Sequence, residues 1–329
     1  MHPGSPPSPR WIDALDQAVQ RHAAEQPPWV WFDQRVRGHM AAHASIPSER
    51  LDTQQGMDAL RAQCAQPASR RRVIYLHVPF CKHICSFCAF FRKASTHADL
   101  EAYTQAALRH IEQFAATTWS QQGPPFEAVY FGGGTPTALS ADQLVRLVAA
   151  VTHAYPLADD CELTVECRFD GLDRAYLRAL QQAGVNRLSF GVQSFDTTLR
   201  RSVGRITDSA QIMQCLSDAA DLGFQQINVD LIYNLPGQSL ESWAADMRTL
   251  QNCPATAASI YALIPMRGSA LVKQIEAGQA SRLGDAQWQY KLFALAHDTL
   301  SHRPDWQGFS FHHFGDQTCE RSVYNQTRA

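Results

Sequence analysis

The stretch VIYLHVPFCKHICSFC, residues 73–88, decides the fold class of this chain. It begins with a short β-branched and aromatic run, 73–78, of the kind that forms a buried strand. The run leads directly into a loop that carries Cys81, Cys85 and Cys88 at C-x3-C-x2-C spacing. Three thiols this close together in one loop are typical of a site for a soft metal centre. Because the loop follows a strand, we expect the functional edge of the fold at the carboxyl ends of its strands.

The three cysteines suit an iron–sulfur cluster better than a zinc ion. Three thiolates can bind a [4Fe-4S] cluster and leave one iron open. A closed zinc site needs a fourth ligand, which His77 or His83 would have to supply. Simple clustering of buried cysteines is a third interpretation. The iron–sulfur hypothesis differs from both alternatives because it predicts chemistry at the open iron.

Five more strand-like runs follow, and helical patterns separate them. Ser140 is the predicted N-cap of one of these helices, and Gly184 and Gly223 are C-cap signals of two others. Alternating strands and helices predict an α/β fold with a parallel sheet that is buried on both faces. Six such units favour a partial (β/α)6 barrel over a full eight-fold barrel. The runs are 128–132, 163–167, 187–192, 227–233 and 259–264, and the helical patterns cover 97–119, 140–154, 172–183 and 209–222.

The segments on either side predict the domain organisation. Residues 1–70 are expected to form an N-terminal extension, with an amphipathic helix over 11–24. Residues 71–270 are expected to form the core barrel. Residues 271–329 are expected to form a short, α-rich C-terminal segment, in which GFSFHHF, 308–314, can form one more strand.

Composition excludes several classes of protein. With 45% hydrophobic and 18% charged residues the chain can fill a large core, which excludes a disordered protein. Lys+Arg 29 against Asp+Glu 31 gives no basic field for nucleic acid or a membrane surface. No apolar run approaches the roughly 18 residues of a membrane span, and MHPGSPPSPR does not resemble a signal peptide. Nine cysteines, most of them scattered, predict a reducing cytoplasm.

Glycine and polar residues follow the later strands at the edge where the cysteine loop is expected. FGGGTPT, 131–137, would let backbone N–H groups approach a ligand closely. Glu166 needs a cation or hydroxyl groups if it is buried, and we favour a ligand's ribose or amine over an internal salt bridge. Gln193 lies just beyond the next strand. Asp230, inside an apolar strand, either faces a ligand or pairs with a cation such as Arg205.

These motifs, in this order, resemble the radical S-adenosylmethionine (SAM) superfamily. From Tyr75 to Ala262 the series YLHVPFC, GGGTPT, VEC, GVQSFD, DLIYNLPGQ and YALIP is similar to the oxygen-independent coproporphyrinogen oxidase-like branch. The resemblance implies that Cys81, Cys85 and Cys88 bind a [4Fe-4S] cluster and that SAM chelates its open iron. It implies a 5′-deoxyadenosyl radical, made when an electron from the cluster splits a carbon–sulfur bond of SAM. The implied SAM contacts, some of which serve a second SAM in part of the branch, are Tyr75, Phe87, Gly133, Gly134, Thr135, Glu166, Gln193, Arg205, Asp230 and Ala262.

The residues after the third cysteine distinguish members of this branch. The oxidases carry a further cysteine where this chain has Phe90, and the haem chaperones usually carry an acidic residue where it has Ala89. CSFCAFFRKA, 85–94, and HHF…CERSVYN, 312–325, are most similar to the anaerobic haem-degrading radical SAM methyltransferases of the ChuW/HutW type.

That resemblance implies methyl transfer to haem, opening of the porphyrin ring and release of iron for iron acquisition. It also implies a low-potential electron donor such as a flavodoxin. Such methyltransferases usually have a further C-terminal region that helps to cover the substrate, and the sequence to Ala329 does not contain it. Two alternatives stay open: a haem chaperone without turnover, and another porphyrin-directed reaction such as oxidative decarboxylation of coproporphyrinogen.

Aromatic and histidine residues bear on the haem hypothesis. Phe87, Phe90 and Phe91 could lie against a flat macrocycle, or could equally wedge the cysteine loop onto the barrel. His312 and His313 are of the type that binds haem iron. Because neighbouring residues of a strand point to opposite faces, at most one of them could do so.

Overall fold

The computed structural model describes residues 51–88, 91–94 and 96–328. The helix predicted over 11–24, and the motif residues Ala89 and Phe90, lie outside the described residues. One large sheet contains the six predicted runs as parallel neighbours, and this confirms the predicted fold class. The parallel strands are β1 (Arg72–Val78), β4 (Phe126–Gly133), β5 (Leu157–Cys167), β6 (Arg187–Gln193), β7 (Gln226–Tyr233) and β8 (Ala257–Ala262).

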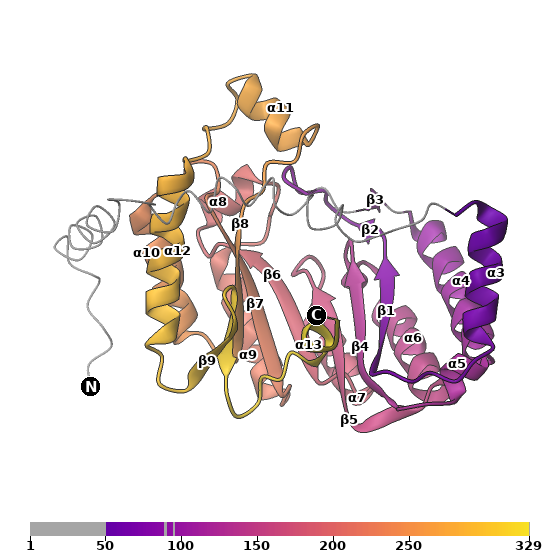
Figure 1. Ribbon diagram of the computed structural model, residues 1–329. Coiled ribbons are helices and arrows are strands. Elements are labelled where there is room, and N and C mark those ends of the chain that lie inside the picture. The colour runs from indigo at the N-terminus through magenta and orange to yellow at the C-terminus, as the bar shows by residue number, and fades with distance from the viewer. Residues whose placement is uncertain (1–50, 89–90, 95, 329) are drawn as a thin grey trace, which may run out of the picture.

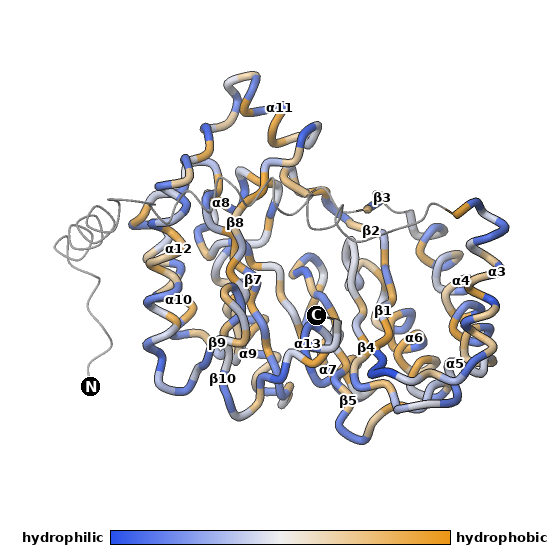
Figure 2. Tube along the Cα trace, in the orientation of Figure 1, coloured by the Kyte–Doolittle hydropathy of each residue, from blue (hydrophilic) through white to orange (hydrophobic). Residues whose placement is uncertain are grey.

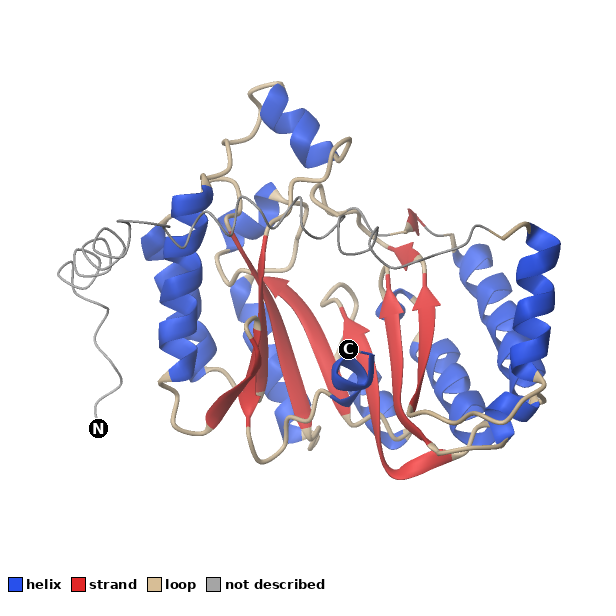
Figure 3. Cartoon of the chain, in the orientation of Figure 1, coloured by secondary structure: helices blue, strands red, loops and turns tan. Residues whose placement is uncertain are grey.

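The C-terminal segment adds two more strands to this sheet. β10 (His313–Asp316) pairs antiparallel with β8, and β9 (Trp306–Ser310) pairs antiparallel with β10. The run GFSFHHF, for which one more strand was predicted, thus contains the end of β9, a turn and the start of β10; the two strands of this hairpin are red in Figure 3. Within the described residues the order β1-β4-β5-β6-β7-β8-β10-β9 leaves the sheet open, with β1 and β9 as its edges. The domain boundaries at residues 70 and 270 remain a prediction.

Helices connect the parallel strands and cover one face of the sheet (Figure 1). The predicted caps are confirmed: Ser140 accepts from the Gln143 amide at the start of its helix, and Gly184 and Gly223 follow helix ends with positive φ. The remaining elements are α3 (Thr53–Cys64), β2 (Phe80–Cys81), β3 (Lys93–Ala94), α4 (His97–Ala115), α5 (Thr118–Gln121), η1 (Pro136–Ala138), α6 (Ala141–Ala154), α7 (Arg174–Gln182), α8 (Thr197–Ser202), α9 (Ser209–Asp221), α10 (Leu240–Asn252), α11 (Ala270–Glu276), α12 (Ala286–Ser301) and α13 (Val323–Arg328).

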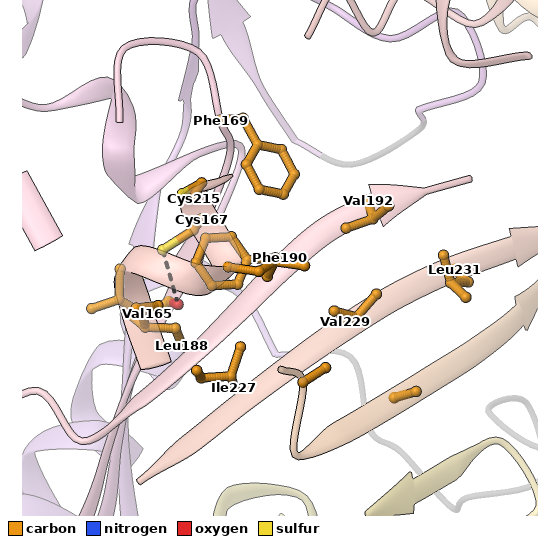
Figure 4. Packing of buried hydrophobic residues seen from close by; sticks show 14 of the residues in the cluster. Val165, Cys167, Phe169, Leu188, Phe190, Val192, Cys215, Ile227, Val229 and Leu231 are labelled. Atoms are coloured by element: carbon orange, nitrogen blue, oxygen red, sulfur yellow. Dashed lines mark hydrogen bonds between the residues drawn. The ribbon is translucent and has the colours of Figure 1, made fainter. Parts of the chain in front are cut away.

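The hydrophobic core lies between the sheet and these helices. Alternate residues of each strand point to one face, so Leu188, Phe190 and Val192 of β6 all enter the core. Figure 4 shows them packed beside Val229 and Leu231 of β7. Hydrophobic and hydrophilic stretches accordingly alternate along the elements in Figure 2. No helix in the described part of the chain is both long and apolar enough to cross a bilayer.

The opposite face of the sheet is polar, although the sequence predicts strands that are apolar throughout. Glu166, Ser189 and Asp230 occupy the alternate positions on β5, β6 and β7. α13 lies on this same face, where Val323 and Tyr324 pack against Ala128 of β4 (Figure 1). A polar face that is covered in part by the chain's own C-terminal segment therefore forms the interior of the open barrel.

Candidate functional site

The cysteine loop lies at the carboxyl ends of the parallel strands, as predicted. Cys81 ends β2 and is buried, Cys85 is buried in the loop that follows, and Cys88 is half-buried. The Cys88 amide donates to the Cys85 carbonyl oxygen at 3.2 Å, which makes a tight turn between these two cysteines. No three Cys, His, Asp or Glu side chains in the part of the chain that the structure describes share a metal-binding position. The assignment of the three sulfurs as cluster ligands therefore remains a prediction.

Neighbouring elements hold the loop in place through its backbone. The Ser86 amide donates to the Val203 carbonyl at 3.2 Å, and the Leu271 amide donates to the Ser86 carbonyl at 2.9 Å. Gly204, with φ +80°, lets the chain after α8 pass close by, because a Cβ there would lie 3.2 Å from the Ile84 carbonyl oxygen. The loop is thus fixed between the end of α8 and the start of α11.

The glycine motif after β4 packs directly against Cys81. A Cβ at Gly134 would lie 3.1 Å from the Cys81 sulfur and 2.9 Å from the Phe80 carbonyl oxygen. Thr135 is buried beside them, with its Oγ1 3.4 Å from the Cys81 sulfur. Only glycine leaves room at this position for the backbone to approach the first cysteine.

We expect Gly134→Ala to reduce iron loading of the reconstituted protein at least about tenfold. The added methyl group must displace either the Cys81 sulfur or the backbone next to it, since closely packed atoms have no free space to yield. Iron per chain after anaerobic reconstitution measures the effect. Gly56→Ala in α3 is the matched control, because nothing lies within 4 Å of a Cβ there. Full iron loading of Gly134→Ala would contradict this packing.

Buried positive charge surrounds Cys85. Arg168, Arg200 and Arg205 are all at most 8% exposed. Arg168 pairs with Asp170 at 2.9 Å, whereas Arg200 and Arg205 make no ion pair with a carboxylate within the described residues. Burial lowers the pKa of Arg200 to about 9. Excess buried positive charge favours an anion, and thiolates with an iron–sulfur core, together with the carboxylate of SAM, are anionic. The residues present therefore fit both groups.

Glu166 joins the glycine motif to the polar face. Its carboxylate accepts from the Tyr130 hydroxyl at 2.9 Å and from the Gly133 amide at 3.0 Å. Burial raises its pKa to about 7. Within the described residues its hydrogen-bond partners are a hydroxyl and a backbone amide, and it makes no ion pair there. The hydroxyl partner is a tyrosine of the neighbouring strand.

We expect Glu166→Gln to weaken SAM binding by about tenfold to a hundredfold, the value of one hydrogen bond to a charged group. A carboxylate with a pKa near 7 ionises as the pH rises, and the ionised form accepts from the amine N–H groups of SAM and attracts its positively charged sulfonium. Wild-type affinity should thus rise between pH 6 and pH 8, while the affinity of the glutamine variant should stay flat. The SAM-induced change in the absorption of the reconstituted protein measures both. Equal pH profiles would contradict a SAM contact by Glu166.

Gln193, Arg205 and Asp230 meet around Gly191. A Cβ at Gly191 would lie 2.8 Å from the Gln193 side chain and 3.4 Å from the Arg205 guanidinium. The register of β6 and β7 places Asp230 opposite Gly191, and an irregularity follows it, with Gln193 at φ 71°. A bulge with a strained non-glycine residue is common beside functional sites. The three predicted SAM contacts are thus brought together.

Asp230 takes its hydrogen bonds from side chains of the sheet itself. Ser189 Oγ donates to it at 3.0 Å and Asn228 Nδ2 donates at 2.9 Å. Arg205 instead donates to the Gly191 carbonyl at 3.0 Å, so the suggested Asp230–Arg205 pair is wrong. Burial raises the pKa of Asp230.

The remaining predicted contacts lie around this group. Tyr75 on β1 is 46% exposed, and its hydroxyl lies 3.1 Å from His77 Nδ1. Ala262 ends β8, opposite Tyr233. Phe87 packs against a small apolar cluster that includes Leu271, which supports the interpretation that it wedges the loop onto the barrel.

The two histidines have different surroundings. His313 is buried, with Nδ1 2.9 Å from Ser259 Oγ and Nε2 3.2 Å from Glu320 Oε1, so it is a core residue and not a haem ligand. His312 lies on the turn before β10, with its ring 5.2 Å from that of Tyr261. Of the two, only His312 is not buried.

Several residues of this site escaped the sequence analysis. Tyr130, Ser189 and Asn228 hold the two carboxylates, and Arg168 with Asp170 borders the cysteine loop. For Ser189 and Asn228 the signal is the alternation of polar residues along otherwise apolar strands, such as Asn228 and Asp230 on β7. An apolar run with every second residue polar indicates one face against a core and one face toward a site.

Comparison with known proteins is consistent with this geometry. The family model of the Radical SAM superfamily matches residues 75–250. Anaerobilin synthase of Escherichia coli O157:H7 is 32% identical over 289 residues, which cover 88% of this chain and 64% of that protein. The heme chaperone HemW of Bacillus subtilis is 36% identical over 192 residues, which cover 58% of this chain and 50% of that protein.

A solved structure shows the same fold. Coproporphyrinogen III oxidase (HemN) from Escherichia coli, a radical SAM enzyme, superimposes with a TM-score of 0.70 at 26% identity, over 82% of this chain and 61% of that one. The chain thus spans about half to two thirds of the length of the relatives that it matches.

Proposed function

Because this chain belongs to the radical SAM superfamily, in the branch similar to HemN, whose members bind a [4Fe-4S] cluster and SAM, we propose that it degrades haem under anaerobic conditions. The proposed reaction transfers a methyl group, opens the porphyrin ring and releases iron. A low-potential donor such as a flavodoxin supplies the electrons. The observation that carries the proposal is the extent of similarity to anaerobilin synthase. It covers 88% of the chain, whereas the haem chaperone of Bacillus subtilis matches over 58%.

The proposed roles of the cysteines and glycines follow from their positions in the site. Cys81, Cys85 and Cys88 would hold the cluster, which together with bound SAM supplies one-electron cleavage of a carbon–sulfur bond. Gly134 would let SAM approach the backbone beside the cysteine loop, because it packs directly on Cys81. The amides of Gly133 and Gly134 already donate to Glu166 and to the Val78 carbonyl oxygen, so Gly133 would act on SAM by holding Glu166.

The two buried carboxylates would orient SAM from the sheet. Glu166 accepts two hydrogen bonds from β4, and Asp230 accepts one from Ser189 of β6 and one from Asn228 of its own strand; these bonds fix both side chains before any ligand arrives. Arg205 supplies positive charge beside them for the carboxylate of SAM. Such preorganised groups lower the cost of binding.

A second candidate function is a haem chaperone, because the heme chaperone HemW of Bacillus subtilis is 36% identical over 192 residues, against 32% over 289 residues for anaerobilin synthase. Such a protein would bind haem and the cluster without consuming SAM. Haem turnover and haem binding are therefore the two results to separate.

Product analysis after anaerobic incubation with haem, SAM and a reductant tests the proposal. We expect bleaching of the haem Soret band and a methylated linear tetrapyrrole in the mass spectrum. Intact haem alongside cleaved SAM would overturn haem degradation, and tight haem binding with no SAM cleavage would favour the chaperone. Cys85→Ala is the control, since it removes a proposed cluster ligand and leaves every other residue of the site unchanged.

A further inference from the structure

We propose that Arg168 positions Cys85 and makes the cluster easier to reduce, with Asp170 as the counterion that sets the strength of this effect. The proposal deepens the proposed function and rests on its assignment of Cys85 as a cluster ligand. Both residues follow β5, outside the group of predicted SAM contacts.

Arg168 reaches into the cysteine loop. Its Nη1 donates to the His83 carbonyl oxygen at 2.5 Å and lies 3.7 Å from the Cys85 sulfur. The residue is 6% exposed, so water screens its charge only weakly. It is thus a buried cation within hydrogen-bonding reach of a predicted ligand sulfur.

Asp170 anchors the guanidinium from the other side. Its Oδ2 lies 2.9 Å from Arg168 Nη2 and 3.4 Å from His83 Nδ1, and its Oδ1 accepts from Thr207 Oγ1 at 3.0 Å. The Asp170 backbone carbonyl accepts from Lys82 Nζ at 3.1 Å. The pair therefore ties the loop to the chain after β5 and to the chain after α8.

A hydrogen bond to the glycine motif holds the backbone of Arg168 in place. Its amide donates to Thr137 Oγ1 at 3.1 Å, and Thr137 belongs to the glycine motif. The guanidinium can therefore move little relative to Cys81 and Gly134, which pack on the same motif. A fixed position is what a charge needs in order to act on one sulfur.

The expected effect has a definite sign. Reduction adds one electron from an external low-potential donor to the cluster and breaks no bond. A nearby cation stabilises the more negative, reduced state, and hydrogen bonds to ligand sulfurs act in the same direction. Asp170 opposes the effect because its charge partly cancels that of Arg168. Removal of the Arg168 charge should therefore lower the reduction potential, and removal of the Asp170 charge should raise it.

The test is an anaerobic redox titration of the reconstituted full chain, followed by electron paramagnetic resonance of the reduced cluster. At one fixed potential we expect Arg168→Gln to lower the ratio of reduced to oxidised cluster about tenfold, and Asp170→Asn to raise it. Arg168→Lys should lie near the wild type. Arg174→Gln is the matched control, since Arg174 pairs with Asp218 on the outer helices.

Opposite shifts for the two variants, with an unchanged control, support the proposal. Shifts in the same direction, or no shift, overturn it, because a merely structural role gives no opposite signs. If Arg168→Gln retains no iron, Asp170→Asn decides alone: a higher reduced fraction supports the proposal, and an equal or lower one overturns it. A wild type that takes up no iron contradicts the cluster site and this proposal together, whereas opposite shifts without haem turnover contradict haem degradation alone.

Discussion

Replacing Glu320 with alanine should cost the chain about 3–5 kcal/mol of its free energy of unfolding. Glu320 is 3% exposed and lies 3.2 Å from the Arg187 guanidinium, which is 2% exposed, and 3.2 Å from His313 Nε2. Removal of one member of a buried pair leaves the other charge without compensation, and such losses are large. Urea unfolding followed by circular dichroism measures the change. Arg321→Ala is the control, because its pair with Asp160 is exposed and should contribute at most about 1 kcal/mol.

A double variant separates charge from packing. Apolar residues at both positions, Arg187→Met with Glu320→Leu, should recover most of the lost stability, since neither charge is then buried. If the double variant is as unstable as Glu320→Ala, or if Glu320→Ala costs less than Arg321→Ala, the buried pair does not stabilise the C-terminal segment.

Acid should remove the same contribution. Burial alone would raise the pKa of Glu320, but Arg187 and His313 lower it below its usual value. A depressed carboxylate pKa gives stability that is present above the unfolded pKa, about 4.3, and is lost as the pH falls through the folded pKa. The difference in stability between wild type and Glu320→Ala should therefore shrink below about pH 4.

Replacing Cys85 with alanine should abolish the iron–sulfur centre. We expect the reconstituted wild type to hold about four irons per chain and to absorb near 400 nm, and Cys85→Ala to show neither this absorption nor a spectral change on addition of SAM. Two remaining thiolates cannot retain a cluster of this kind against chelators. Iron analysis and absorption spectra after anaerobic desalting measure the outcome.

Another cysteine provides the control for this variant. Cys64→Ala, on the partly exposed α3, should load iron normally, because Cys64 lies outside the loop and is half-buried. A Cys85→Ala protein with about four irons would mean that the ligand set is wrong.

The sequence predicted the parts of the molecule that depend on local patterns. The strands around Val165, Phe190 and Val229 follow from short apolar runs, and the Ser140 cap follows from one hydroxyl before a helical pattern. The carboxyl-end position of the cysteine loop follows from its place after the first strand. Each of these features is set by residues a few positions apart.

Long-range partners could not be predicted in this way. Arg187 and Glu320 are 133 positions apart, so nothing in either local pattern points to the other. Glu162 likewise accepts from the Val323 and Tyr324 amides at the start of α13. The second strand of the β9–β10 hairpin was missed because one aromatic run holds the end of one strand, the turn and the start of the next.

The measurement that tests the central claim most directly is the amount of 5′-deoxyadenosine formed anaerobically from SAM by the reconstituted protein with a strong reductant. A radical SAM site at the cysteine loop predicts 5′-deoxyadenosine from the wild type and none from Cys85→Ala. An iron-loaded wild type that binds SAM and releases no 5′-deoxyadenosine would contradict it.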